Sequence, residues 1–504
     1  MSSHYDVLII GAGVSGIGMA CQLAARCPNK RVAILERRKS IGGTWDLFKY
    51  PGVRSDSDML TYGFSFRPWT KTTVFADGPS IKTYLIETAR EYGINKAIKF
   101  GQRIVRCEWI SVEQRWNVTA IDEDSGEERR FTGDFLVGAT GYYNYDEGYL
   151  PKFKGVERFK GQLIHPQHWP EGLNYRGMQV VVIGSGATAV TLVPAMAPDA
   201  GHVTMLQRSP SYLFSFPGTD GVLAMLKRVM PERWACALLR KRNILLQRFI
   251  YKNARRFPRL ARSLLLAGVR GGVGPDFDMS HFTPNYMPWD ERLCVVPDGD
   301  LYKVLREGKA SVVTDEIQSF AERGILLKSG RMLEADIVIA ATGLQLQMFG
   351  AVELRIDGKA KNLGQCMTYK GVLVQDTPNF AYMMGYTNAS WTLKIDVAAA
   401  YVCRILNEMD QRGVKAVTPR APVGELQDEG ILGALCRAGY VQRGGSLMPR
   451  QGRQVPWRVL HMYEKDRVMY RRSIDDPALE WGHAAPRPTF KQGVVAIGST
   501  ATSH

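Results

Sequence analysis

The sequence predicts an α/β protein that contains two similar strand–turn–helix units and an α-helical insertion. The stretch DVLIIGAGVSG at residues 6–16 is an apolar run followed by a glycine-rich turn, and QVVVIGSGATAV at residues 179–190 repeats this pattern. Short β-branched and aliphatic runs that end in such a turn are typical of buried parallel strands leading into helices. Between Leu223 and Leu266, apolar residues recur at helical spacing among basic residues, which predicts the insertion.

The chain has 504 residues, enough for two or three domains, and its 45% hydrophobic and 23% charged residues are ordinary for a soluble protein. It has no apolar run of about 18 residues that would span a membrane, and its first residues do not form a secretion signal. The eight cysteines form no CxxC pair and no His/Cys cluster with metal-ligand spacing. We therefore expect a cytoplasmic protein with reduced, mostly buried thiols and no metal site.

The net charge of +16 is concentrated in residues 227–262, where basic side chains surround a single acid, Glu232. This stretch is a candidate for peripheral contact with an anionic membrane. A solvated helical face is the alternative. No zinc-finger, helix-turn-helix or RNA-binding motif accompanies the charge, so no nucleic-acid partner is expected.

The order of the patterns divides the chain into six segments. The run FLVGATG at residues 135–141 predicts a buried strand of the first unit, and two antiparallel strands are expected around Ile104–Ala120. The run ADIVIAATG at residues 335–343 repeats the strand-to-ATG ending, which indicates a return to the first unit. We expect residues 1–145 in the first unit, 146–211 in a linker and the start of the second unit, 212–287 in the insertion, 288–334 in the second unit, 335–483 in the first unit again and 484–504 in a loose tail.

Gly11, Gly13 and Gly16 form a GxGxxG motif directly after the first predicted strand. The first glycine makes the turn, the second admits a pyrophosphate to the backbone N–H groups, and the third lets helix and strand pack closely. Glu36 ends the next strand, near the spacing expected for an acid that binds a ribose. This pattern predicts a dinucleotide site; a glycine turn without a ligand is the alternative.

The second unit has Gly184, Gly186 and Ala189 as a GxGxxA motif. Its second strand ends without an acid, and Arg208 and Ser209 stand there instead. An arginine suits a 2′-phosphate, which a carboxylate would repel, so NADPH is favoured over NADH. The alternative is a surface arginine with no ligand.

Two nucleotide sites of different polarity imply two Rossmann-like domains, one for FAD and one for NADPH. A disulfide reductase of this design needs a redox-active cysteine pair, which the chain lacks. The reducing equivalents must leave the flavin by another route, and molecular oxygen is the obvious acceptor.

The stretch FKGQLIHPQHWP between the two glycine motifs resembles the FxGxxxHxxxW(P/D) signature of Baeyer–Villiger monooxygenases. The matching residues are Phe159, Gly161, His165, Trp169 and Pro170. Flavin monooxygenases that oxidise N or S usually carry Tyr or Phe in place of this Trp. The stretches GGTWDLFKYPGVRSDSDM and GYTNASWTLK resemble most the ethionamide-activating branch of the family, and the resemblance covers about residues 5–480.

The resemblance implies an enzyme that uses FAD, NADPH and oxygen to convert ketones to esters or lactones through a flavin C4a-peroxide. Thioethers or thioamides are further expected substrates. The catalytic arginine of the family corresponds to Arg292 in PWDERLC, and the carboxylate that orients it corresponds to Asp56 in YPGVRSDSD. Asp58 stands close enough that the sequence does not separate it from Asp56.

The same resemblance implies further cofactor contacts. Gly43, Thr44 and Trp45 of the GGTW motif are expected beside the flavin, although Trp45 is equally expected as an ordinary core residue. A helix is predicted to begin within Asn388–Trp391, capped by Asn or Ser, and its N-terminal dipole would face the flavin pyrimidine oxygen. His165 is expected to tie the linker to a moving NADPH domain rather than to act as an acid or base.

The chain departs from many relatives at Glu291, where they carry a Lys that assists at the 2′-phosphate, and this weakens the expected preference for NADPH. Three alternatives to a ketone monooxygenase remain open. They are a flavin monooxygenase that acts mainly on N or S, an NADPH oxidase that releases peroxide, and a membrane-binding protein in which FAD is structural.

Overall fold

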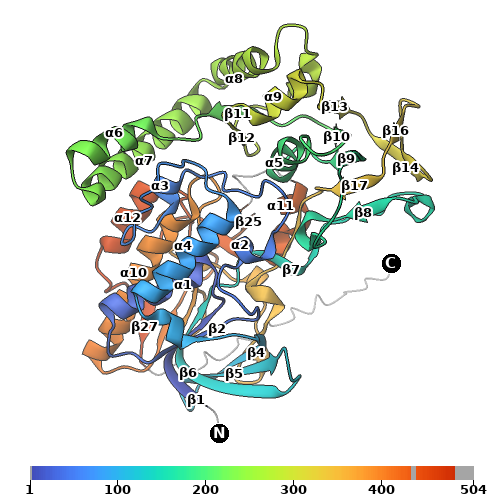
Figure 1. Cartoon of the computed structure of the whole chain (residues 1–504). Helices are drawn as coiled ribbons and strands as arrows, with labels where there is room; N and C mark the ends of the chain where they lie inside the picture. The colour runs from blue at the N-terminus through green and yellow to red at the C-terminus, as the bar shows by residue number, and fades with distance from the viewer. Residues whose placement is uncertain (1–2, 433–438, 483–504) are drawn as a thin grey trace, which may run out of the picture.

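The protein, described here by a computed structural model over residues 3–432 and 439–482, has two parallel-stranded units side by side (Figure 1). The first unit begins with β1 (Ser3–Ile10), α1 (Val14–Arg26) and β2 (Val32–Leu35). β1 lies between β2 and β6 (Glu128–Gly138) and runs parallel to both. The predicted opening of a doubly wound sheet is therefore confirmed.

Antiparallel strands extend the first sheet on one side. β4 (Gln102–Ile110) and β5 (Arg115–Asp122) form the hairpin predicted around Ile104–Ala120, and β5 pairs with β6. The complete order is β20-β19-β4-β5-β6-β1-β2-β3, with β23 also pairing to β6. The other strands of this sheet are β3 (Ile98–Lys99), β19 (Glu353–Ile356), β20 (Lys359–Ala360), β21 (Thr368–Tyr369), β22 (Leu373–Val374) and β23 (Phe380–Tyr382).

The second sheet is parallel and has the order β13-β10-β9-β17-β8. Its strands are β8 (Gln162–Ile164), β9 (Gln179–Ile183), β10 (His202–Gln207), β13 (Ala310–Thr314) and β17 (Ile337–Ala340), with α5 (Ala187–Met196) and α9 (Asp300–Arg306) between them. The assignment of residues 335–343 to the first unit is wrong. β17 pairs with β9 as β6 pairs with β1, because each ATG-ended strand completes its own sheet.

The insertion consists of α6 (Gly221–Val229), α7 (Glu232–Arg256) and α8 (Pro258–Val273), which form one edge of the molecule (Figure 1). The predicted helical insertion is confirmed. The strands β11 (Leu213–Phe216) and β12 (Cys294–Pro297) flank it and pair with each other. A small core that includes Leu60, Leu223 and Leu239 joins the insertion to the first unit.

Two linkers cross between the sheets. β7 (Tyr143–Gly148) leaves the first unit, and β18 (Leu344–Leu346) returns to it and pairs antiparallel with β7. The two crossings therefore share one hydrogen-bonded ribbon, which brings the ends of both glycine turns to the same region.

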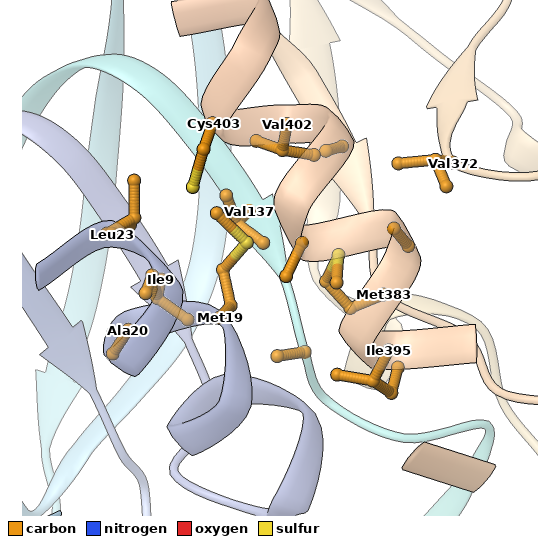
Figure 2. Packing of buried hydrophobic residues seen from close by; sticks show 14 of the residues in the cluster. Ile9, Met19, Ala20, Leu23, Val137, Val372, Met383, Ile395, Val402 and Cys403 are labelled. Atoms are coloured by element: carbon orange, nitrogen blue, oxygen red, sulfur yellow. The ribbon is translucent and has the colours of Figure 1, made fainter. Parts of the chain in front are cut away.

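The core of the first unit lies between its sheet and the long helix α10 (Trp391–Arg412). Figure 2 shows Met19 and Leu23 of α1 beside Val402 and Cys403 of α10, with Ile9 of β1 beneath them. Met19, Leu23 and Val402 are fully buried. Residues scattered over the chain therefore build one apolar layer that holds the first glycine turn in place.

The remaining elements are short or lie at the periphery. They are α2 (Thr44–Leu47), α3 (Met59–Tyr62), α4 (Gly78–Glu91), β14 (Ile317–Ala321), β15 (Gly324–Leu327), β16 (Met332–Glu334), β24 (Val417–Pro419), β25 (Leu426–Gly430), α11 (Gly439–Gly444), β26 (Arg450–Gly452), α12 (Tyr463–Arg471) and β27 (Leu479–Trp481). Seven cysteines are free and buried, as expected, and Cys436 lies outside the described residues. The predicted tail, 484–504, lies outside them as well.

Candidate functional site

The first glycine turn is shaped by close backbone approach. Gly11 has φ +104°, and a Cβ placed on it would lie 2.6 Å from the carbonyl oxygen of Ala139. A Cβ on Gly16 would overlap the carbonyl oxygen of Gly11. Both positions therefore require glycine for reasons internal to the fold, with the third glycine bringing helix against strand as predicted.

The second glycine turn repeats this geometry. Gly184 has φ +139°, and its Cβ would lie 2.5 Å from the carbonyl oxygen of Ala341. Ala189, at the third position of the motif, is fully buried on α5. Ala139 and Ala341 are the first residues of the two ATG triplets. The first glycine of each turn therefore packs directly against the backbone of an ATG triplet.

The middle glycine of each turn has a different environment. A Cβ on Gly13 would make only an ordinary contact, 3.5 Å from Cα of Gly43, and one on Gly186 would meet no atom within 4 Å. Each of these glycines precedes a helix, α1 or α5, without a side-chain cap. The open side of both turns thus presents backbone N–H groups suited to a pyrophosphate.

Glu36 lies just beyond the end of β2 and faces the first turn. Its carboxylate accepts hydrogen bonds from the backbone N–H of Ala12 at 2.6 Å and of Arg38 at 2.7 Å. Burial raises the pKa of Glu36, and the two N–H donors act in the opposite direction. A carboxylate held rigidly beside the turn is arranged to accept a ribose hydroxyl.

A cavity of about 1350 Å³ begins at the first glycine turn and runs to the helical insertion. It brings together most of the residues predicted for the flavin side of the site, from five separate stretches of sequence. The predicted residues on its wall are Gly13, Thr44, Trp45, Asp56, Arg292 and Asn388. Gly43 adjoins this wall, since its backbone packs against Gly13.

The N-terminus of α10 opens into this cavity. Ser390 is the capping residue, but its side chain makes no cap hydrogen bond and instead contacts Thr61 at 2.6 Å. Two neighbouring cavity residues have buried atoms without a partner in the described chain: Oγ1 of Thr387 and Oδ1 of Asn388. The predicted helix start is confirmed. This end of the cavity contains buried polar atoms whose hydrogen bonds are not made within the described chain, and a heteroaromatic ligand with polar ring atoms could supply them.

Asp56 and Arg292 lie on the wall of the same cavity. Both act on the buried thiol of Cys294, whose pKa is raised to about 12: burial is the largest cause, Asp56 also raises the pKa, and Arg292 lowers it. The two charged groups are therefore near one another in space, although 236 positions separate them in the sequence numbering.

Asp58 is occupied by structural contacts. It caps α3 by accepting from the N–H of Thr61 at 3.1 Å. It also accepts from Asn243 at 2.9 Å and from Gln247, both on α7. Asp58 thus ties the insertion to the first unit, whereas Asp56 is exposed at the cavity.

The signature stretch spans the boundary between the units. A Cβ on Gly161 would overlap the carbonyl oxygen of Asp336 where β8 meets β17, so the position requires glycine. Phe159 packs edge-to-face on Phe320 with ring centroids 5.7 Å apart. Trp169 packs at the margin of the core of the second unit, and Pro170 is exposed.

His165 is held between the two linkers. Its Nδ1 accepts the backbone N–H of Gln167 at 3.2 Å, so the proton is on Nε2, which donates to the carbonyl oxygen of Gly343 at 3.3 Å. Burial lowers the pKa of His165, which favours this neutral form. A smaller cavity of about 190 Å³, lined by His165, Asp56 and Thr188, lies between the units.

Arg208 and Ser209 follow β10 and are exposed. Arg208 acts electrostatically on Glu291: burial raises the pKa of this carboxyl, and Arg208 lowers it. Glu291, which stands where many relatives carry a lysine, therefore interacts electrostatically with Arg208, the residue expected to bind the 2′-phosphate.

The sequence did not predict a role for two further residues on the cavity wall. Trp289 has φ +66°, a strained value for a non-glycine residue, three positions before Arg292. Tyr62 accepts a hydrogen bond from Nε1 of Trp45 at 2.8 Å, and the two rings pack edge to face. The sequence patterns assigned no role to either residue, although Trp289 lies in the same PWDERLC stretch as Arg292, and both line the cavity.

Comparisons with known proteins agree with this geometry. Residues 4–251 match the family model described as flavin-binding monooxygenase-like. The chain is 55% identical to the putative FAD-containing monooxygenase MymA of Mycobacterium tuberculosis, over 96% of this chain and 99% of that protein. The chain belongs to the flavin-binding monooxygenase family.

Within this family, the chain is also 48% identical to the FAD-containing monooxygenase EthA of Mycobacterium tuberculosis, over 97% of this chain and 99% of that protein. Among solved structures, oxidised steroid monooxygenase bound to NADP has a similar fold, with a TM-score of 0.77 at 22% identity over 95% of this chain and 100% of that one. The resemblance recognised in the motifs is confirmed, and so is the fold with two dinucleotide-binding domains.

Proposed function

We propose that this monooxygenase binds FAD at the first glycine turn and NADPH at the second, and inserts oxygen beside the carbonyl of an apolar ketone to form an ester or lactone. Its relatives are named as FAD-containing proteins, and a structure of the same fold is bound to NADP. The observation that carries the proposal is that Asp56 and Arg292 both lie on the wall of the cavity that begins at Gly13.

The residues present fit an FAD. The open side of Gly13 would accommodate the pyrophosphate, Glu36 would accept hydrogen bonds from the ribose hydroxyls, and the unsatisfied Oδ1 of Asn388 would be available to a polar group of the ligand. When bound and reduced by NADPH, the flavin supplies activated dioxygen. The N-terminal dipole of α10 favours negative charge at this end of the cavity.

Arg292 contributes a fixed positive charge at the place where oxygen becomes negative. A guanidinium stays protonated at every working pH, so it stabilises an anion without itself gaining or losing a proton. Asp56 orients Arg292 and keeps its charge directed into the cavity. His165, neutral and held by Gly343, maintains the contact between the signature and the second linker.

The substrate end of the cavity is apolar. Phe214 and Leu223 line it together with Leu265 and Leu293, and helices α7 and α8 supply further aliphatic and aromatic side chains. Such a wall excludes water and strengthens the charge of Arg292. We therefore expect long or bulky apolar ketones rather than small polar ones.

Product analysis tests this function. The flavin-loaded enzyme would receive NADPH with a linear long-chain ketone or with the thioether of matched length, and the ester and sulfoxide would be measured by mass spectrometry. Arg292→Ala should lower ester formation by about 10²–10³-fold, because one charge-stabilising donor has been removed. Arg323→Ala, an exposed arginine of the second unit, is the matched control.

The competing functions give different products. Sulfoxide without ester would identify an enzyme that acts on sulfur. NADPH consumption that is independent of ketone, with full recovery of hydrogen peroxide, would identify an oxidase. Ester formation that is equal in Arg292→Ala and the native protein would refute the role of Arg292.

A further inference from the structure

Exposed apolar side chains are concentrated on the insertion. Among the described residues, Val222, Val229 and Phe249 are 43%, 74% and 66% exposed, and most large exposed hydrophobic residues lie between 222 and 264. Single exposed apolar residues are ordinary, but a cluster of this kind marks an interaction surface.

Helix α7 carries the apolar residues in one outward row. Trp234, Leu238 and Leu245 are 72%, 52% and 51% exposed, and Phe249 follows four positions later. The spacing i, i+4, i+11 and i+15 places all four on one face of a helix. Another side of α7 is buried against the first unit through Cys236 and Leu239, so Trp234, Leu238 and Leu245 face outward and Phe249 lies at the mouth of the cavity.

Lysines are interspersed in the apolar row. Lys241 and Lys252 lie on the same face of α7, both are exposed, and neither forms an ion pair within residues 3–432 and 439–482. Over residues 227–262, Glu232 is the single acid among many arginines and lysines. A surface that combines exposed apolar side chains with lysines matches the chemistry of an anionic lipid surface, with acyl chains beneath negative headgroups.

The same surface surrounds the mouth of the large cavity. Eight large apolar residues are both exposed and part of the cavity wall: Phe216, Val222, Leu246, Phe249, Ile250, Phe257, Leu260 and Leu264. The apolar lining thus continues without interruption from the cavity onto the outer face of α7 and α8.

We propose that α7 and α8 dock in the plane of an anionic phospholipid bilayer, and that apolar substrate passes from the bilayer directly into the cavity. Within the described residues, no helix is long and apolar enough to cross a membrane, so the contact is interfacial. A bilayer is favoured over nucleic acid because the outward row places aromatic and aliphatic groups, not only cations, at the surface. The docking is independent of the reaction; the passage of substrate rests on the proposed function.

Vesicle flotation tests the docking with the full-length, flavin-loaded protein. The probes are vesicles of phosphatidylcholine alone and of an equimolar mixture with phosphatidylglycerol. The native protein should float with the anionic vesicles and not with the neutral ones, and added salt should weaken binding. The triple variant Trp234→Ser, Leu238→Ser and Leu245→Ser should bind at least tenfold more weakly, and Lys241→Gln with Lys252→Gln about tenfold more weakly.

Matched controls separate this surface from general effects. Val112→Ser replaces a residue that is 92% exposed between β4 and β5, and Lys96→Gln with Lys359→Gln removes two exposed lysines of the first unit. These variants should bind vesicles like the native protein. Equal binding by all variants, or no binding by the native protein, would overturn the proposal. Conversion of a native dimer to a monomer by the triple variant, without vesicle binding, would instead identify a second copy of the chain as the partner.

Substrate delivery has its own test. The triple variant should oxidise a long-chain ketone dissolved in anionic vesicles at least tenfold more slowly than the native protein, but a short water-soluble ketone at an unchanged rate. Equal slowing of both ketones would refute delivery from the bilayer. If the native protein oxidised neither ketone, the proposed reaction would fail, and the flotation result would still decide the docking.

Discussion

Asn243 of α7 donates a hydrogen bond of 2.9 Å to Asp58, which caps α3 in the first unit. The Asp58 carboxylate therefore both caps α3 and holds the insertion against the first unit. Its neighbour Asp56, two positions earlier, faces the cavity. The two acids look equivalent in the sequence but have different surroundings.

Asp58→Ala is expected to destabilise the protein by about 1–3 kcal/mol, because a cap is lost and buried amide donors are left unpaired. Asp56→Ala should leave the unfolding temperature unchanged and lower the rate of ketone oxidation roughly a hundredfold through a misplaced Arg292. Thermal unfolding and steady-state turnover of both variants distinguish these effects. An unfolding temperature that falls equally in both would contradict the assignment.

Gly13→Ala and Gly16→Ala should fail in different ways. A methyl group on Gly16 overlaps the carbonyl oxygen of Gly11, so the backbone must move and the unloaded protein loses stability. A methyl group on Gly13 is accommodated by the fold but occupies the ligand side of the turn. We expect Gly13→Ala to purify with native stability and little flavin, as measured by visible absorbance and by unfolding of the flavin-free protein. A flavin content equal to that of the native protein would count against the proposed site.

The choice between NADPH and NADH is expected to depend on Arg208 and Glu291. Arg208→Ala should raise the KM for NADPH about tenfold without changing that for NADH, since only the former carries the 2′-phosphate. Glu291→Lys should lower the KM for NADPH severalfold, because a repelling charge becomes an attracting one. The ratio of kcat/KM for the two cofactors measures both effects, with the exposed Arg331→Ala as control. An unchanged ratio would remove Arg208 from the site.

Acid sensitivity is expected from His461, which is buried behind Asn388. Burial and the nearby Lys394 lower the pKa of His461 from 6.5 to about 4. Below pH 6.5 the unfolded chain takes up this proton more readily than the folded one, so stability falls as the pH drops toward 4. The loss is at most roughly 3 kcal/mol.

Denaturant unfolding at several pH values between 4 and 7 tests this expectation. The native protein should lose more stability across this range than His461→Gln, whose side chain does not titrate. His168→Gln, an exposed histidine, is the control and should follow the native protein. Identical pH profiles for the native protein and His461→Gln would exclude the effect.

Much of the architecture followed from local patterns. The glycine motifs at Gly11 and Gly184 predicted two strand–turn–helix units, because the turn chemistry and the apolar strand before it are adjacent in sequence. The helical spacing between Leu223 and Leu266 likewise predicted the insertion. The motif around His165 indicates the family from residues that are close together in the sequence.

Sheet membership, in contrast, is a long-range property. The strand before the second ATG triplet looked like a return to the first unit because it repeats the earlier sequence pattern. Ile337 in fact pairs with Val180, so the strand completes the second sheet. Hydrogen bonds between strands join residues far apart in the chain. A repeated local sequence pattern therefore does not specify in which sheet the strand pairs.

The sequence by itself determined the two nucleotide folds, the helical insertion and the family, since each depends on residues close together along the chain. Only the tertiary structure decided that Asp58 is buried in a helix cap while Asp56 is exposed on the cavity wall, that Trp289 adopts a strained backbone near Arg292, and that the apolar row of α7 faces outward. These facts depend on which surfaces the packed units bury and which they leave open, and that is settled by contacts between distant segments.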